Sequence, residues 1–148
     1  MDQNAQAIFQ LQDSYVNEYT LTILKKIESK EDIVVTGQLG FGIESISEND
    51  ETYSGQIVLI NDLSISIKDE EYAKIHISMR GLFYGVKNSE NSLENFEKML
   101  KINGATALSH LIRAYVYTNT GLSGIPQIST PMINFVKFFE DAEKDNKK

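Results

Sequence analysis

The chain has 148 residues, of which 41% are hydrophobic and 24% are charged, and its formal net charge is −7. This length suits one domain with a substantial core, taken here as residues 1–148, and the apolar fraction excludes an intrinsically disordered chain. Because the sequence has no cysteine, disulfides, thiolate zinc sites and cysteine nucleophiles are excluded. The acidic balance and the scattered basic residues argue against nucleic acid as a partner.

Two further features predict a location in the cell. The first six residues are polar and have neither the basic nor the apolar region of a secretory signal. No apolar run approaches the roughly 20 residues that are needed to cross a bilayer. We therefore expect a cytoplasmic protein that does not insert into membranes.

The N-terminal half, about residues 8–84, alternates between apolar and polar residues, which is the pattern of β-strands with one buried face. In the first strand, Asp13 and Asn17 interrupt the alternation and predict a bulge or bend. The apolar face of that strand is expected to carry Phe9, Leu11, Tyr15, Tyr19, Leu21 and Ile23. A charged crossover segment at 25–32 and turns at 49–51 and 69–70 separate three further strands. Short turns between sequential strands predict a four-stranded antiparallel sheet.

After the strands, the apolar spacing becomes helical. Asn91 and Glu94 have the spacing of a capping box, which predicts a helix N-terminus at Asn91. Asn103-Gly104 suits the left-handed turn that ends a helix, so this first helix is expected to stop there.

A second helix is expected from about residue 105, and Thr130-Pro131 is expected to be the N-cap and first residue of the last one. The helices together span about residues 92–144. Strands grouped before helices predict an α+β fold, with the C-terminal helices packed on one face of the sheet.

The residue types that carry chemistry are sparse. The two histidines, His76 and His110, lack the spacing of a metal site, and no acid/base constellation is visible. The glycines of the run 37–42 lie inside a strand pattern, so they indicate a curved or closely approached strand and not a phosphate-binding loop. We expect no catalytic residue, no metal and no cofactor.

Two stretches of the sequence resemble the SecB family of bacterial protein-export chaperones. Residues 103–139 combine an apolar helix, a glycine-broken loop with the step Pro126-Gln127, and a Pro-Met-Ile-Asn-Phe start to a helix rich in phenylalanine. At the other end, the sequence FQLQ at 9–12, followed by Tyr15, is similar to the family's first strand. Both stretches occur in the family's order with compatible spacing, so the resemblance covers nearly the whole chain.

The resemblance implies a SecB-like fold that assembles as a dimer of dimers and acts as an ATP-independent holdase for unfolded polypeptides, such as preproteins for export. It also implies a hydrophobic client groove between the second strand, its crossover segment and the last helix, with the strand's glycines keeping the groove floor open. By position, the groove residues are Leu39, Phe41, Ile43, Ile128, Phe135 and Phe139.

The second helix carries surplus apolar surface, which together with the resemblance implies a homotetramer. The expected interface residues are Leu108, Leu111, Ile112 and Tyr115.

In the SecB family, acidic residues on the exposed sheet face dock on the motor SecA. In this chain Glu18 retains an acidic side chain at one of these positions, while Thr22 and His76 occupy the two others. Docking on SecA would therefore be weakened. An alternative to general export is a SecB-like adaptor that serves one partner, for example an antitoxin or a mobile-element protein.

Overall fold

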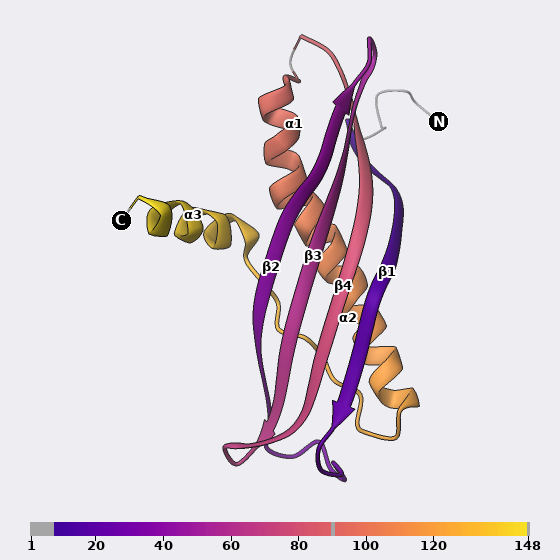
Figure 1. Cartoon of the computed structure of the whole chain (residues 1–148), viewed down its shortest axis with the longest axis vertical. Helices are drawn as coiled ribbons and strands as arrows, with labels where there is room; N and C mark the ends of the chain where they lie inside the picture. Colours follow the sequence, from indigo (N-terminus) through magenta and orange to yellow (C-terminus); the bar gives the residue numbers. More distant parts are fainter. Residues whose placement is uncertain (1–7, 90, 148) are drawn as a thin grey trace.

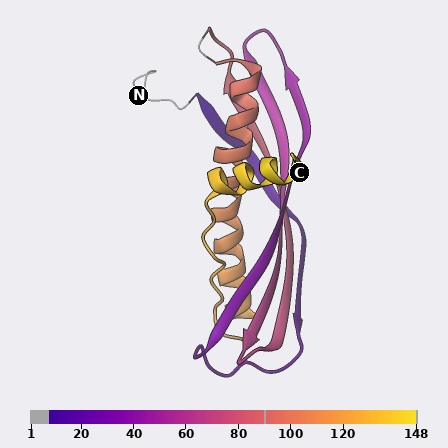
Figure 2. The ribbon, with the colours of Figure 1, turned by 90° about the vertical axis from the view of Figure 1, so that its left-hand side faces the viewer.

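The computed structural model describes residues 8–89 and 91–147 and forms two layers, a long twisted sheet and a column of helices on one of its faces (Figures 1 and 2). The strands are β1 (Phe9–Ile23), β2 (Ile33–Glu48), β3 (Thr52–Ile67) and β4 (Glu70–Val86). All neighbours are antiparallel in the order β1-β4-β3-β2, so β1 and β2 form the two edges. The predicted α+β class is confirmed.

The alternation of buried and more exposed residues along β3 and β4 explains why these strands lie at the centre of the sheet. Every second residue of β3, from Tyr53 to Ile65, is buried, and the same holds for the matching face of β4. The opposite face carries mostly polar and charged side chains, as expected for a sheet with one side in water.

The predicted irregularity in β1 is confirmed. Its register against β4 shifts between Leu11 and Asp13 and again between Val16 and Glu18. Each shift moves the following side chains to the other face, because the side chains of a strand alternate with a period of two. Tyr15 therefore pairs with Arg80 on the outer face and is 51% exposed. The prediction that Tyr15 belongs to the apolar face is wrong.

The turns that join the last three strands follow side-chain chemistry. The Asn49 side chain accepts hydrogen bonds from the backbone N–H groups of Glu51 and Thr52, which confirms the turn predicted at 49–51. The β3–β4 hairpin turns at Lys68 and Asp69, which both have positive φ. This two-residue turn lies one position before the predicted one. Two-residue turns with positive φ are favoured in hairpins because their backbone twist matches that of the flanking strands.

The predicted end of the first helix at Asn103-Gly104 is wrong. Helix α1 (Leu93–Met99), the π-helical turn η2 (Leu100–Gly104) and helix α2 (Ala105–Leu122) follow without a break. Gly104 has φ −64°, which is right-handed. A Cβ atom there would lie 2.9 Å from Ile57 Cδ1, so this glycine allows the helix to approach β3 and does not end it.

The N-terminus of α1 also differs from the prediction. Ser92, and not Asn91, is the N-cap, because its side chain accepts the N–H of Asn95. Asn91 is buried and donates through Nδ2 to the backbone oxygen of Val86 at 2.7 Å, which ties the end of β4 to the start of the helix.

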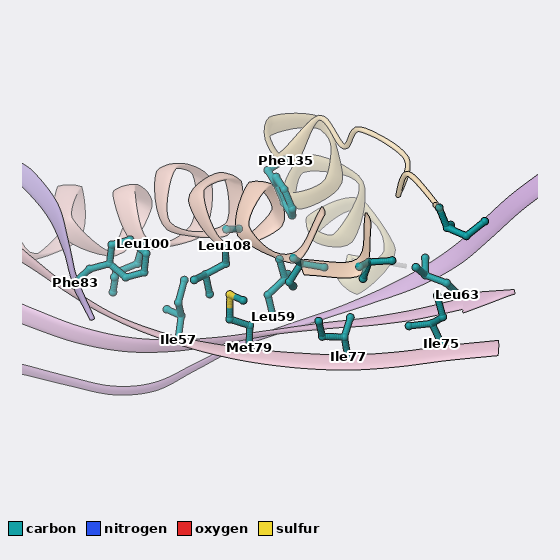
Figure 3. Close-up of a cluster of buried hydrophobic side chains, with 14 of the residues drawn as sticks. Ile57, Leu59, Leu63, Ile75, Ile77, Met79, Phe83, Leu100, Leu108 and Phe135 are labelled. Carbon is teal, nitrogen blue, oxygen red and sulfur yellow. The ribbon is translucent and has the colours of Figure 1, made fainter. Parts of the chain in front are cut away.

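The helix column packs closely on the centre of the sheet (Figure 3). Leu100 and Leu108 are fully buried against β3 and β4. Glycines lie directly beneath them: a Cβ atom on Gly55 would stand 2.6 Å from Leu100 Cδ1, and one on Gly81 would stand 2.8 Å from Leu108 Cδ2. The small residues of the sheet therefore set the distance between the two layers.

The segment 123–134 runs back along α2 and leads into helix α3 (Phe135–Asn146) (Figure 1). The backbone N–H of Ile128 donates to the buried hydroxyl of Thr120 at 2.9 Å, and Thr130 is also buried. These contacts hold the chain outside a helix past Thr130-Pro131, so α3 begins only at its N-cap Asn134. The predicted start at Thr130 is four residues too early.

We predict that Gly81→Ala destabilises the fold by about 1–3 kcal/mol, because the new methyl group would overpack against Leu108 and Phe83. The measurement is the free energy of unfolding by urea. Gly42→Ala is the matched control, since its Cβ would meet Val58 only at an ordinary contact distance of 3.5 Å. Equal losses in the two variants would contradict this account of the layer spacing.

Candidate functional site

The candidate site lies where the edge strand β2 passes α3. Leu39, Phe41 and Ile43 alternate along β2 on the face that carries the helices. Their cross-strand partners in β3 are Asn61, Leu59 and Ile57, all buried, whereas the three β2 side chains keep part of their surface accessible. The β2 row is thus the partly open margin of the apolar sheet face.

Phenylalanines from α3 complete the site. The Phe41 and Phe139 rings meet edge-to-face with centroids 5.0 Å apart. Phe139 also contacts Phe138 at 5.1 Å and Phe135 at 6.3 Å. Such aromatic pairs contribute about 0.5–1.5 kcal/mol beyond their buried area, so they hold the start of α3 against β2.

The structure divides the six expected groove residues into two groups. Leu39, Phe41, Ile43 and Phe139 come together with accessible surface on one side of the molecule. Ile128 and Phe135 are each only 2% exposed, and Figure 3 shows Phe135 pointing from α3 toward the sheet. The expectation that these two line an open groove is wrong, because they are core residues that support the site from behind.

The expected role of the β2 glycines is also wrong. Gly40 and Gly42 pair with Ile60 and Val58, which alternate with the buried residues of β3 and so lie on the outer face. They therefore cannot open the floor of a site on the helix face. The crossover segment 24–32 lies at the far end of the sheet from α3, so it forms no common wall with it (Figure 1).

Part of this surface does not follow from the sequence pattern. Val136 is exposed on α3, beside a hollow of about 380 Å³ between α1, η2 and α3. Ile102, Val136 and Phe139 line this hollow together with glutamates of α1 and α3 and lysines of α1 and η2. The spacing of the phenylalanines carries part of the signal, but the direction in which α3 crosses the helix column was needed to locate this surface (Figure 2).

The expected interface residues also fall into two groups, buried and partly exposed. Leu108 and Ile112 are fully buried in the core of this chain, so they have no surface to offer a second copy. Leu111 is 38% exposed and Tyr115 is partly exposed, with its ring edge-on to Tyr19 of β1 at 5.1 Å. Only Leu111 and Tyr115 remain as predicted interface residues.

On the outer face, three strands contribute to one charged cluster. His76 of β4 contacts Asp62 Oδ1 through Nδ1 at 2.6 Å and Glu18 Oε2 through Nε2 at 3.4 Å. The hydrogen bond with Asp62 is the main cause that raises the pKa of His76, and the nearby charges of Asp62 and Glu18 act in the same direction. Beside the cluster is a shallow hollow of about 590 Å³, lined by polar side chains such as Thr20 and Gln38.

Residues 8–89 and 91–147 contain neither a candidate metal site nor a candidate membrane-spanning helix. No group of His, Asp and Glu side chains in those ranges could hold a metal ion. No helix within them is long and apolar enough to cross a membrane.

Comparisons with known proteins identify the fold. The SecB-like chaperone Rv1957 of Mycobacterium tuberculosis, solved in complex with a ChAD peptide from the antitoxin HigA1, matches with a TM-score of 0.61 and 16% identity. The match covers 84% of this chain and 90% of that chain. A protein of unknown function from Streptococcus agalactiae matches with a TM-score of 0.45 and 14% identity, over 84% of this chain and 97% of that one. Neither a family model nor a curated protein sequence matches. The chain therefore has a SecB-like fold.

We predict that His76 makes stability depend on pH. A raised pKa in the folded state means that protonation favours folding, so this contribution is fully present below the unfolded pKa of about 6.5. It is lost as the pH rises through the higher folded pKa. The His76→Gln variant should therefore be less stable than the parent near pH 6, and the two should converge at higher pH.

The measurement is the free energy of unfolding between pH 6 and pH 9. The control His110→Gln removes an imidazole from the exposed side of α2, away from the sheet. A gap between parent and His76→Gln that widens toward high pH would contradict the cluster's role.

Proposed function

We propose that this protein is an ATP-independent holdase that binds non-native polypeptides at the margin between β2 and α3. The observation that carries the proposal is the contact of Phe41 with Phe139, two aromatic side chains that keep accessible surface at the open edge of the apolar sheet face. Desolvated aromatic anchors dominate most polypeptide interfaces. The SecB-like fold supports the same function, and no step in it requires a nucleotide.

Binding of unfolded chains needs apolar surface that is accessible without unfolding of the holdase itself. The site provides this, because Leu39 and Ile43 extend the aromatic pair along β2. Its support is rigid, since Phe135 behind Phe139 is buried in the core. A client side chain can therefore replace solvent at the margin while the sheet and the helix column stay intact.

A dedicated adaptor is the second candidate function. The observation that favours it is the neighbour Rv1957, which was solved with a peptide from one antitoxin. A panel of unrelated unfolded proteins separates the two: a general holdase protects most of them with similar affinity, whereas an adaptor binds one partner far more tightly than the rest. Both functions use the same surface and place the protein in the cytoplasm without enzymatic activity.

Docking on a SecA-type motor would be weak in either case. Of the three outer-face positions that correspond to the family's docking residues, only Glu18 is acidic, and its side chain faces His76. Each exposed charge pair contributes about 0.2–1 kcal/mol, so one partly compensated carboxylate offers little attraction to a basic tail.

We predict that the double variant Phe41→Ser with Phe139→Ser lowers the affinity for unfolded clients at least about tenfold, because each desolvated aromatic anchor contributes on the order of 1–3 kcal/mol. The measurement is suppression of aggregation of a slowly folding protein, with circular dichroism to verify the fold. Tyr15→Ser is the matched control, since Tyr15 is an exposed aromatic residue on the opposite face. Full protection by the double variant would refute the proposed site.

We also propose that the chain assembles as a homotetramer through the exposed side of α2. Obligate interfaces bury about 2,000 Å² or more, so the single chain should be scarcely populated at micromolar concentration. Leu111→Glu is expected to lower the mass measured by light scattering, because it places a charge in the apolar contact. Val34→Glu, an exposed position on β2, should leave the mass unchanged. A parent protein with the mass of one chain would overturn the proposal.

A further inference from the structure

The two edges of the sheet are protected very differently. Edge strand β1 has two register shifts and carries Asp13 and Glu18, and bulges and charges of this kind prevent another strand from pairing. Edge strand β2 has neither over residues 33–43: the run contains no charged residue and no proline, and its first register shift comes only after Ile43. A long regular edge without such protection is a template for a further strand.

Two glycines of β2 have no explanation inside the chain. A Cβ atom on Gly40 would meet Ile60 Cβ at 3.6 Å, and one on Gly42 would meet Val58 Cγ1 at 3.5 Å, both ordinary contact distances. Among the described glycines only Gly124 has the positive φ that demands glycine, so backbone conformation does not explain Gly40 and Gly42 either. Glycine inside a strand lowers stability and often marks a place where another chain approaches closely.

These glycines contrast with Gly37 on the same strand. A Cβ atom on Gly37 would lie 2.7 Å from Leu63 Cδ2, so the packing of the core accounts for that residue. Packing inside the chain therefore accounts for Gly37 but not for Gly40 and Gly42. At these two positions the outer face of β2 has no side chain beside the half-buried Ile60 and Val58.

The two faces of β2 together indicate which side chains a strand paired with β2 would carry on each of its faces. On the helix face, Leu39 and Phe41 offer apolar contacts next to Phe139. On the outer face, Gly40 and Gly42 leave room between them for large side chains. A strand added along β2 would place alternate side chains on each of these surfaces, because the side chains of a strand point to opposite faces in turn. Large side chains beside edge glycines also restore the cover that glycine lacks.

We propose that the edge of β2 from Val34 to Ile43 takes an extended client segment as a fifth strand, with large client side chains lying over Gly40 and Gly42. This inference rests on the proposed holdase function and adds to it the manner of recognition. The client class is an extended, proline-free segment with aromatic or β-branched residues at alternate positions. Affinity comes largely from backbone hydrogen bonds, so many sequences are accepted.

A single client strand fits this edge better than a second copy of the sheet. Helix α3 projects past the β2 edge beside Phe41 (Figure 1). Two sheets joined edge to edge through β2 would bring a projecting α3 from each copy to the same joint, whereas one extended segment passes beneath a single α3. The run 34–38, beyond α3, is mostly exposed and available for pairing.

The test uses a synthetic peptide of about ten residues, in which phenylalanine and valine alternate with threonine. Only every second peptide N–H points toward the edge strand in a ladder, so N-methylation of one alternate set should abolish pairing while the other set tolerates it. We expect the affinities of the two N-methylated peptides for the full chain, measured by fluorescence anisotropy, to differ at least about tenfold.

The glycines provide a second test, with two readouts of opposite sign. Gly40→Val and Gly42→Val are expected to maintain or raise the melting temperature, because valine suits a strand and no internal clash opposes it. Both should weaken peptide binding at least about tenfold. Thr22→Val is the matched control, because Thr22 is an exposed residue on the outer face of the opposite edge strand β1, and its peptide affinity should stay unchanged.

Each outcome decides between the proposals. If the parent binds the peptide but tolerates both N-methylated sets equally, strand addition is overturned while the holdase function stands. Weaker binding by the valine variants without N-methyl alternation would place the client on the outer face and also overturn it. Valine variants that lose oligomer mass instead of peptide affinity would assign the edge to a second copy. No binding of peptide or unfolded protein by the parent would overturn both proposals.

Discussion

The architecture depends on a mismatch of widths between the helix column and the sheet. Four strands at about 4.8 Å spacing are roughly twice as wide as one helix with its side chains, which measures about 10 Å across. The column α1-η2-α2 therefore buries the centre of the apolar face fully, as Ile57 and Ile77 show, but leaves both margins incompletely covered. Phe41 on β2 and Tyr19 on β1 remain partly exposed for this reason.

The close approach of the two layers makes the centre rigid enough to carry such margins. Gly55 and Gly81 let Leu100 and Leu108 reach the sheet backbone, and the π-helical turn η2 keeps the column continuous past Gly104. With this centre formed, the two margins can serve different purposes. We propose the β2 margin, with Phe41 and Phe139, for client binding and the exposed side of α2 for assembly.

Much of the candidate site could be predicted from the sequence because its residues follow simple periods. Leu39, Phe41 and Ile43 stand at alternate positions of a strand, and Phe135 and Phe139 stand one helical turn apart. Exposure could not be predicted in this way. Phe135 and Phe139 have the same residue type and the same helix, yet the first is buried in the core and the second meets Phe41 at the surface. That difference depends on the direction in which α3 leaves the segment 123–134.

The sequence by itself determined the order of strands and helices, the polar and apolar faces of β3 and β4, and the bulges near Asp13 and Asn17, because these depend on the residues next in the chain. Tertiary structure alone decided three other features. Gly104 continues a helix because Ile57 lies against it, Tyr15 faces outward because the register shift reverses its side, and Gly40 faces away from the helices because β3 fixes the pairing. Each depends on a partner distant in sequence, and local periodicity carries no information about that partner.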